Sequence, residues 1–377
     1  MKHKRYISQA VTEFLETRMV FIGGPRQVGK TTLGLQFLTP PQPSNPAYLN
    51  WDDVTARALL KKAELPPTPI ILIDEIHKFK GWRSLIKGFY DTRKETQKFI
   101  ITGSAKLDHY RRGGDSLLGR YRYIRLHPFA PTELDLTAES DLDHLLHFGG
   151  FPEPFTSGSE KILRLWHKER LYRIVNDDIR SLENLREYSS IELLADALPE
   201  RVGSILSVNA LAGDLSVNYR TADHWIRILE QVYYAFRISP YGTSRFRSAK
   251  KEKKLYLWDW SSIDSVGARF ENLVASQLLQ YCHFVEDTEG DLMELRFIRD
   301  AQGREVDFVV LKNKQPIFAV ECKTGEKALS PHISYFKERT PVPYFYQVHR
   351  GKKDYIAEDR VRVLPFLKFC REVLSQG

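Results

Sequence analysis

The chain has 377 residues, so at roughly 150 residues per domain it is too long to be a single small binding module. Hydrophobic residues make up 42% and charged residues 28%, a balance that excludes disorder as the default and is typical of soluble proteins with packed cores. The 56 Lys and Arg against 48 Asp and Glu give a net charge of +8, which is compatible with nucleic-acid binding but not diagnostic of it.

The first third of the chain, residues 1–134, alternates short apolar runs with polar stretches. The clearest runs cover residues 19–22, 70–73 and 99–102. Strands of a parallel sheet are buried on both faces and are therefore continuously apolar. We predict an α/β domain built on a parallel sheet.

Residues 24–31 read Gly-x-x-x-x-Gly-Lys-Thr between the first apolar run and a helical stretch, the context of a phosphate-binding loop. In such a loop backbone N–H groups and a helix N-terminus bind the phosphates, Lys30 reaches the β and γ phosphates, and the Thr31 hydroxyl binds Mg²⁺. ATP and Mg²⁺ are the predicted cofactors. The predicted nucleotide-binding residues are Gly24, Pro25, Arg26, Gln27, Val28, Gly29, Lys30, Thr31, Thr32 and Asp74.

The second apolar run ends in Asp74-Glu75, two carboxylates at the carboxyl end of a buried strand. We predict that Asp74 and Thr31 hold Mg²⁺ and that Glu75 is the general base for the attacking water. The third run ends in Thr102-Gly-Ser104, where a polar side chain could position that water. Ser104 is the first choice for this role and Thr102 the second.

Residues 103–125 hold six basic and two acidic residues. Within this stretch Arg120 is predicted to neutralise charge on the γ-phosphate, in its own subunit or in a neighbouring one. The alternative is a solvated basic face. The predicted catalytic residues of the ATPase are thus Glu75, Lys30, Ser104 and Arg120.

Five strings of the sequence, GGPRQVGKTTL, IILIDEIHK, ITGSAK, GRYRYIRLHPF and FGGFPEP, resemble the AAA+-like P-loop ATPases found mainly in bacteria and archaea. In these proteins the ATPase is fused to a C-terminal domain of ill-defined function, and the resemblance covers nearly the whole chain. Asp74-Glu-Ile-His77 also matches the Asp-Glu-x-His box of superfamily 2 helicases. That alternative requires a second RecA-like sheet, which nothing after residue 150 predicts.

Residues 135–200 carry apolar positions at helical spacing and predict a helical lid or linker. A helix-turn-helix is expected next, with a short helix over 209–215, a turn over 216–218 and a second helix over 219–231. The predicted buried stripe of the second helix is Ala222, Trp225, Ile226 and Leu229. Its predicted nucleic-acid face is Tyr219, Arg220, His224 and Arg227.

Two expected strands, over residues 233–239 and 254–259, flank a basic segment, and residues 217–254 hold nine basic and three acidic residues. A basic hairpin beside such a helix predicts the wing of a winged helix that follows a phosphate backbone. A protein-docking module with a solvated loop is the alternative. The predicted DNA-binding residues are Arg220, His224, Arg227, Arg245, Arg247, Lys250, Lys251, Lys253 and Lys254.

The last third predicts a second acidic site. A hairpin over residues 306–323 places Asp307 beside Glu321 and Lys323, which share one face of their strand. Glu271 lies on a preceding helix, directed towards the sheet, where it needs a partner. The set resembles the PD-(D/E)XK nuclease core, which implies that Glu271, Asp307 and Glu321 bind a metal and that Lys323 is the catalytic lysine. DNA cleavage and an inactive, binding-only domain remain alternatives.

The sequence contains no apolar run of roughly 18 residues and no signal peptide, so we expect a cytoplasmic protein without membrane contact. The expected architecture is α/β with four parts. They are a P-loop AAA+-like ATPase domain (1–134), a helical lid or linker (135–200), a winged helix-turn-helix (201–260) and a restriction-endonuclease-like α/β domain (261–377).

The expected function is Mg²⁺-dependent ATP hydrolysis that acts on DNA, by a chain that can form a homo-oligomer. The alternative is an ATP-regulated protein-interaction switch whose nuclease-like domain is catalytically inactive.

Overall fold

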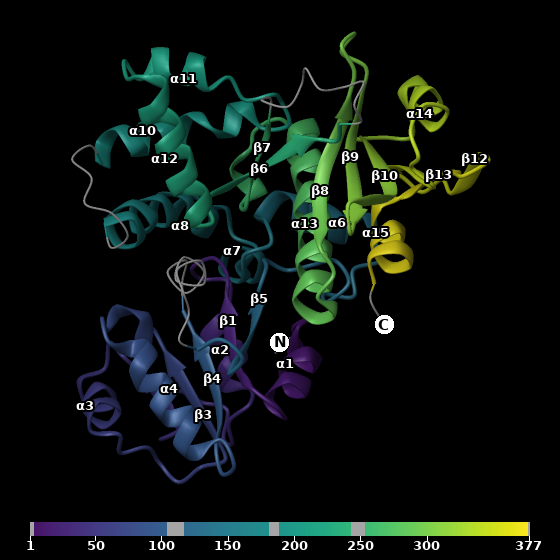
Figure 1. The fold of residues 1–377 in the computed structure, drawn as a ribbon. Helices are drawn as coiled ribbons and strands as arrows, with labels where there is room; N and C mark the ends of the chain where they lie inside the picture. Colours follow the sequence, from purple (N-terminus) through teal and green to yellow (C-terminus); the bar gives the residue numbers. More distant parts are fainter. Residues whose placement is uncertain (1–3, 104–116, 181–187, 243–252, 376–377) are drawn as a thin grey trace. The chain divides into compact units, whose positions relative to one another are not determined.

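The structure is a computed structural model that describes residues 4–103, 117–180, 188–242 and 253–375. The chain divides into two compact units, Met1–His127 and Pro128–Gly377. The first is purple to blue in Figure 1 and the second runs from teal through green to yellow. Among the described residues no helix combines the length and the apolar character that crossing a membrane requires.

The first unit is built on a parallel sheet with the strand order β2-β3-β4-β1-β5 among its described residues. Its elements are α1 (Ser8–Leu15), β1 (Met19–Gly23), α2 (Lys30–Leu35), β2 (Tyr48–Asn50), α3 (Val54–Lys62), β3 (Ile70–Asp74), η1 (Ile76–Lys78), α4 (Trp82–Arg93), β4 (Lys98–Thr102) and β5 (Tyr121–Arg125). The three predicted apolar strands are confirmed as β1, β3 and β4. Because β4 lies between β1 and β3, its carboxyl end lies between the phosphate-binding loop and Asp74.

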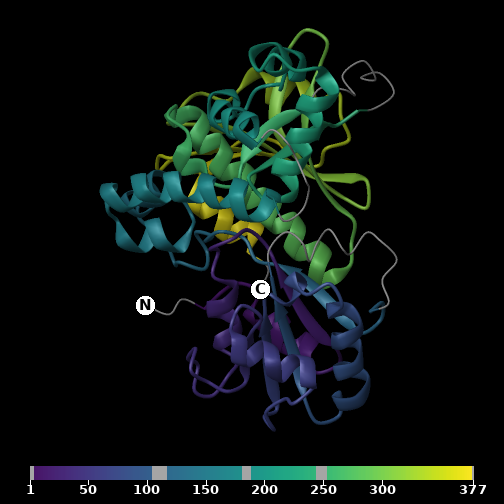
Figure 2. The ribbon, with the colours of Figure 1, turned by 90° about the vertical axis from the view of Figure 1, so that its left-hand side faces the viewer.

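The second unit begins with helices, as the sequence predicts for residues 135–200. They are α6 (Glu139–Phe148), α7 (Pro152–Ser157), α8 (Glu160–Arg173), the π-helix η2 (Ile174–Ile179), α10 (Tyr188–Ala197) and the short η3 (Pro199–Arg201). Helices α8 and η2 follow one another without a break (Figure 2). The predicted pair of helices comes next as α11 (Val208–Asp214) and α12 (Tyr219–Gln231). The expected stripe of α12 is buried, with Ala222, Trp225, Ile226 and Leu229 at most 3% exposed.

The remaining strands of the second unit form one mixed sheet of eight described strands, in the order β12-β13-β11-β10-β9-β8-β6-β7. They are β6 (Ala235–Pro240), β7 (Lys254–Leu257), β8 (Met293–Arg299), β9 (Glu305–Lys312), β10 (Gln315–Lys323), β11 (Phe345–His349), β12 (Tyr355–Glu358) and β13 (Val361–Pro365). The helices of this part are η5 (Trp260–Ser262), α13 (Val266–Glu289), α14 (Pro331–Lys337), α15 (Phe366–Phe369) and η6 (Cys370–Leu374).

Strands β6 and β7 pair antiparallel, as expected for a hairpin. Strand β6 also pairs with β8, so this hairpin forms one end of the large sheet and is not a free-standing element. The four-part division predicted from the sequence remains a prediction. The pairing of β6 with β8 nevertheless joins residues assigned to the third part with residues assigned to the fourth.

A buried polar network centres on Asp259, which follows β7. The carboxylate of Asp259 accepts hydrogen bonds from Trp166 Nε1 at 2.9 Å and from Ser261 Oγ at 2.6 Å. The guanidinium of Arg170, itself only 7% exposed, supplies the opposite charge and lies 4.7 Å from the ring centre of Phe151. The network ties helix α8 to the segment between β7 and α13.

Candidate functional site

The phosphate-binding loop has the backbone that its glycines allow. Gly24 and Gly29 have φ angles of 133° and 97°, which residues with a Cβ atom rarely adopt. A Cβ on Gly24 would lie 2.3 Å from the carbonyl oxygen of Leu126, so the backbone just after β5 leaves no room for a side chain at this position. Helix α2 begins at Lys30 and directs its N-terminal N–H groups into the loop.

Lys30 lies over this loop. Its ammonium donates to the carbonyl oxygens of Gly24 at 3.0 Å and Pro25 at 2.6 Å, and the residue is 7% exposed. Arg5, which was not predicted from the sequence to belong to the site, stabilises the loop by donating a hydrogen bond from Nη1 to the carbonyl oxygen of Val28 at 2.8 Å. The loop therefore places an ammonium where the β and γ phosphates of a nucleotide would bind.

Both carboxylate oxygens of Asp74 accept hydrogen bonds from hydroxyl groups of the site. Oδ2 accepts from the hydroxyl of Thr31 at 2.6 Å and from that of Tyr48 at 3.2 Å, while Oδ1 accepts from the hydroxyl of Thr102 at 2.5 Å. Burial, and then the charge of Asp74, raise the pKa of Tyr48 to about 12, so its hydroxyl remains a donor. A hydroxyl and a carboxylate so close fit the oxygen ligands that Mg²⁺ prefers, so the side chains of Thr31 and Asp74 could hold it.

Glu75 lies at the end of β3 in a left-handed conformation, with φ of 57°. Its N–H donates to the carbonyl of Thr102 at 3.1 Å, and its Oε2 lies 3.5 Å from both His77 Nε2 and Lys78 Nζ. Burial, and then the neighbouring Asp74 carboxylate, raise the pKa of Glu75 above its ordinary value. A carboxylate whose pKa moves towards neutrality becomes a better proton acceptor for catalysis.

The end of β4 contributes Thr102, which is fully buried and oriented towards Asp74. Ser104, the first choice for positioning water, lies outside the described residues, so that prediction stays untested. Thr102 instead orients a carboxylate that would hold Mg²⁺, a supporting role typical of residues behind metal ligands.

Replacing Thr102 by Val should raise the Mg²⁺ concentration needed for half-maximal ATP turnover by roughly 10- to 100-fold, because Asp74 loses the hydroxyl that orients it. A Mg²⁺ titration of phosphate release measures this shift. Thr96→Val, at an exposed position, is the matched control and should leave the titration unchanged. An unaltered Mg²⁺ requirement in the Thr102 variant would show that its hydroxyl does not support the metal ligand.

Arg120 does not lie at the phosphate edge of its own sheet. It precedes β5, which runs parallel to β1, and its carbonyl accepts from the N–H of Met19 at the start of β1. Five residues of strand, roughly 16 Å, separate that end from the phosphate-binding loop. Arg120 pairs with Asp91 through Nε at 2.7 Å and Nη2 at 3.1 Å. The role predicted for Arg120 within its own subunit is therefore wrong, while a role in a neighbouring subunit stays a prediction.

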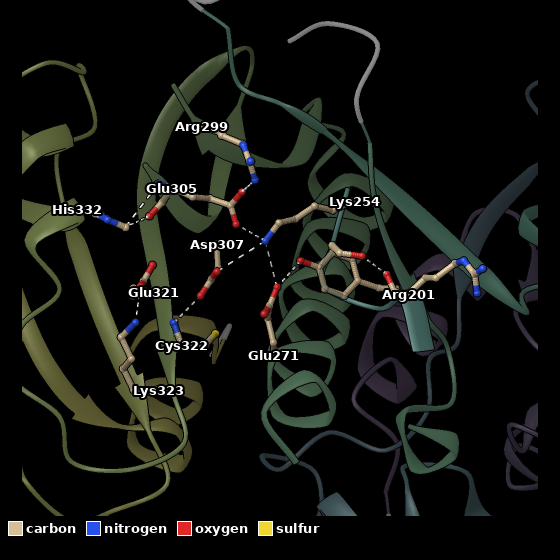
Figure 3. Close-up of polar contacts among 12 residues, drawn as sticks. Arg201, Lys254, Glu271, Arg299, Glu305, Asp307, Glu321, Cys322, Lys323 and His332 are labelled. Carbon is tan, nitrogen blue, oxygen red and sulfur yellow. Dashed lines mark hydrogen bonds and ion pairs between the residues drawn. The ribbon is translucent and has the colours of Figure 1, made fainter. Parts of the chain in front are cut away.

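The acidic site predicted in the last third is divided in the structure. Glu271 and Asp307 both face the ammonium of Lys254, at 3.2 Å and 3.7 Å (Figure 3). Glu321 pairs with Lys323 at 2.7 Å, which confirms that these two side chains project together. Among the described residues no three His, Cys, Asp or Glu side chains are arranged to hold a metal ion.

Lys254 was predicted to bind DNA, and the structure contradicts that role. Its side chain is 3% exposed and its ammonium lies 2.5 Å from Glu305 Oε1, a carboxylate not singled out from the sequence. Burial alone would lower the pKa of Lys254, but the carboxylates of Glu271, Asp307 and Glu305 raise it above its ordinary value. Lys254 is thus a buried cation and not a contact for phosphate.

The structure describes some of the other residues predicted to bind DNA and not the rest. Arg220, His224 and Arg227 are exposed on one side of α12, and Arg227 pairs with Asp223 at 2.5 Å. Lys253 is partly exposed beside β7. Outside the described residues lie Arg245, Arg247, Lys250 and Lys251.

Three successive stretches of the chain match known protein families. Residues 16–134 match the family described as AAA domain. Residues 139–266 and 266–369 match two families described as domains of unknown function, DUF8612 and DUF4143. The first unit therefore contains an AAA-family P-loop ATPase domain, and the rest of the chain belongs to domains to which no function has been assigned.

Similarity over about three quarters of the chain extends to proteins of bacteria and archaea. Uncharacterized proteins of Mycobacterium bovis and Mycobacterium tuberculosis are each 24% identical in an alignment of 322 residues that covers 79% of this chain and 71% of theirs. An uncharacterized protein of Methanocaldococcus jannaschii is 25% identical over 349 residues, covering 73% of this chain and 71% of its own.

Two solved structures of the RuvB Holliday junction branch migration motor of Thermotoga maritima are also similar. They are 16% and 18% identical, with TM-scores of 0.30 and 0.29, and the matches cover 61% of this chain and 88% of each motor chain. TM-scores this low do not assign a function to the chain.

Proposed function

We propose that this protein is a Mg²⁺-dependent ATPase that binds DNA through its second unit and couples ATP hydrolysis to the way that DNA is held. The observation that carries the ATPase part is the convergence of Lys30, Thr31, Asp74 and Glu75 at one edge of the first sheet. The Thr31 hydroxyl donates to Asp74 Oδ2 at 2.6 Å, and the Lys30 ammonium donates to the carbonyl oxygen of Pro25 in the loop at 2.6 Å.

The chemistry divides among these residues. When bound, Mg²⁺ would neutralise charge on the phosphate oxygens. Lys30 would bind the β and γ phosphates, and Thr31 with Asp74 would fix the position of the metal. Glu75 would take the proton from the attacking water, for which its raised pKa is suited.

Support for DNA binding comes from helix α12, which follows α11 and precedes the antiparallel strands β6 and β7, the order of elements expected of a winged helix. Arg220, His224 and Arg227 lie within one side of this helix and are exposed. Asp223 on the same side is held by Arg237 at 3.1 Å and by Arg227. Arg227 is thus partly neutralised, and we expect Arg220 to contribute more to phosphate binding.

Replacing Arg220 and Arg227 together by Ser should weaken DNA binding and reduce the slope of log affinity against log salt by about 2, one for each lost phosphate contact. Binding of labelled duplex DNA measured at several salt concentrations gives both values. Arg164→Ser combined with Arg371→Ser is the charge-matched control, because both arginines are exposed on other elements. Equal losses in the two double variants would mean that α12 is not the DNA-binding face.

A second candidate function assigns the second unit a purely binding role, with ATP as the regulator and no cleavage of nucleic acid. One observation favours it for the nuclease-like part: the ammonium of Lys254 occupies the space among Glu271, Glu305 and Asp307. The sheet with β8, β9 and β10 antiparallel and β11 parallel to β10, preceded by α13, supports the nuclease-like fold without requiring its activity.

A further inference from the structure

Three carboxylates, those of Glu271 on α13 and of Glu305 and Asp307 on β9, surround the ammonium of Lys254. Lys254 is the first residue of β7, and because side chains alternate along a strand, Lys254 and Tyr256 project to the same side. Both reach Glu271: the ammonium lies 3.2 Å from Oε1, and the Tyr256 hydroxyl donates to the same oxygen at 2.8 Å. The lysine completes its contacts with Glu305 at 2.5 Å and Asp307 at 3.7 Å (Figure 3).

Groups other than Lys254 also contact these carboxylates. Asp307 Oδ2 accepts from the N–H of Cys322 at 2.8 Å, and Glu305 Oε2 lies 3.1 Å from Arg299. A Cβ on Gly203 would lie only 3.1 Å from both oxygens of Glu271, so backbone covers that carboxylate on another side. The cluster is therefore a packed arrangement of fixed charges around one buried ammonium.

A catalytic metal does not fit this arrangement. A divalent ion bound to Glu271 and Asp307 would lie beside the buried ammonium of Lys254, whose positive charge repels a second cation, and Mg²⁺ requires oxygens at about 2.0–2.1 Å in octahedral order. The third predicted ligand, Glu321, is held by Lys323.

We propose that Lys254 is the permanent cation of this cluster, in place of a divalent metal, and that the second unit is consequently a metal-free form of the nuclease-like fold. The proposal goes beyond the proposed ATPase function and does not depend on it. Removing the ammonium should then create a divalent-cation site from Glu271 and Asp307, which would become the available hard ligands.

The test counts Mn²⁺ bound to the full chain by the loss of its free electron-paramagnetic-resonance signal. All proteins carry Asp74→Asn, which removes a ligand of the ATPase metal. The Lys254→Met variant should bind one Mn²⁺ more than the parent, and adding Asp307→Asn should abolish the gain. Lys253→Met, next to it in the chain but partly exposed, is the matched control and should bind no more than the parent.

The unsubstituted Lys254 protein decides the proposal even if the variant folds poorly. Binding of Mn²⁺ by this parent that disappears with Asp307→Asn would overturn it, because the cluster would then take a metal with its lysine present. A second variant, Lys254→Met with Glu305→Gln, leaves one carboxylate fewer to repel its neighbours. With millimolar Mn²⁺ its melting temperature should rise by about 5 °C or more, and no rise together with no Mn²⁺ bound would also overturn the proposal.

Discussion

Replacing Glu75 by Gln is expected to lower kcat for ATP hydrolysis by at least about 100-fold, with ATP binding close to that of the unaltered protein. Glutamine preserves the size of the side chain but cannot accept a proton from water. Glu75 is partly buried beside Asp74 and its Oε2 lies 3.5 Å from Lys78 Nζ, so the substitution removes a charge while the surrounding contacts can persist. Phosphate release under saturating ATP and Mg²⁺ measures the rate, and a fluorescent ATP analogue measures binding.

Glu64→Gln is the control for this change, because Glu64 is exposed and follows α3, away from the site. Its turnover should equal that of the unaltered protein. A Glu75→Gln protein that retains more than about a tenth of the turnover would show that another group accepts the proton, which would remove the central role assigned to the end of β3.

The second large effect concerns stability. Asp259→Ala should lower the free energy of unfolding of the second unit by about 3–5 kcal/mol, because it removes the carboxylate that most strongly stabilises the charge of the buried Arg170 guanidinium. It also removes the acceptor for Trp166 Nε1 and Ser261 Oγ. Urea unfolding followed by tryptophan fluorescence measures the change. Asp264→Ala, at an exposed position nearby, should stay within about 0.5 kcal/mol of the unaltered protein.

The same network predicts how the stability of the second unit changes with pH. Burial alone would raise the pKa of Asp259, but Arg170, His167 and the hydrogen bonds from Ser261 and Trp166 lower it below its ordinary value. Its contribution is therefore complete above the unfolded pKa, about 3.9, and is lost as the pH falls through the folded pKa. An Asp259→Ala protein as stable as the parent at neutral pH would contradict the role assigned to Asp259 in stabilising the charge of Arg170.

The phosphate-binding site could be predicted from sequence because its parts are local. A glycine loop between a strand and a helix, and two carboxylates at the end of an apolar strand, are each contained in a few adjacent residues. Parallel pairing then brings these ends to one edge of the sheet. Thr102 was ranked second to Ser104 because sequence cannot tell which side chain of Thr102-Gly-Ser104 faces Asp74.

Lys254 shows why the second acidic site was predicted less well. In the sequence it ends a run of basic residues, which favours a solvated or DNA-binding surface. Its burial depends on β7 lying in the large sheet near Glu271, Glu305 and Asp307, residues that follow it by 17 or more positions. Pairing over such distances is not encoded in any local pattern, and neither is the orientation of a single side chain at a strand end.

The role of Arg120 within its own subunit was predicted wrongly for a related reason. In the sequence, the stretch that contains it is marked only by its basic residues, but residues 121–125 form strand β5, which lies beside β1. A residue just before a strand and a residue just after it lie at opposite edges of the sheet. The sequence carried no alternating or continuously apolar signal strong enough to reveal this strand, because Tyr121, Arg122 and Arg125 interrupt it.

The central claim is that ATP hydrolysis in the first unit responds to DNA bound by the second. Phosphate release by the full chain, measured with ATP and Mg²⁺ in the presence of single-stranded, duplex and branched DNA and in its absence, tests this most directly. We predict turnover that rises several-fold with at least one of these DNA forms and is lost in Glu75→Gln. Equal turnover with every DNA form and without DNA would contradict the account.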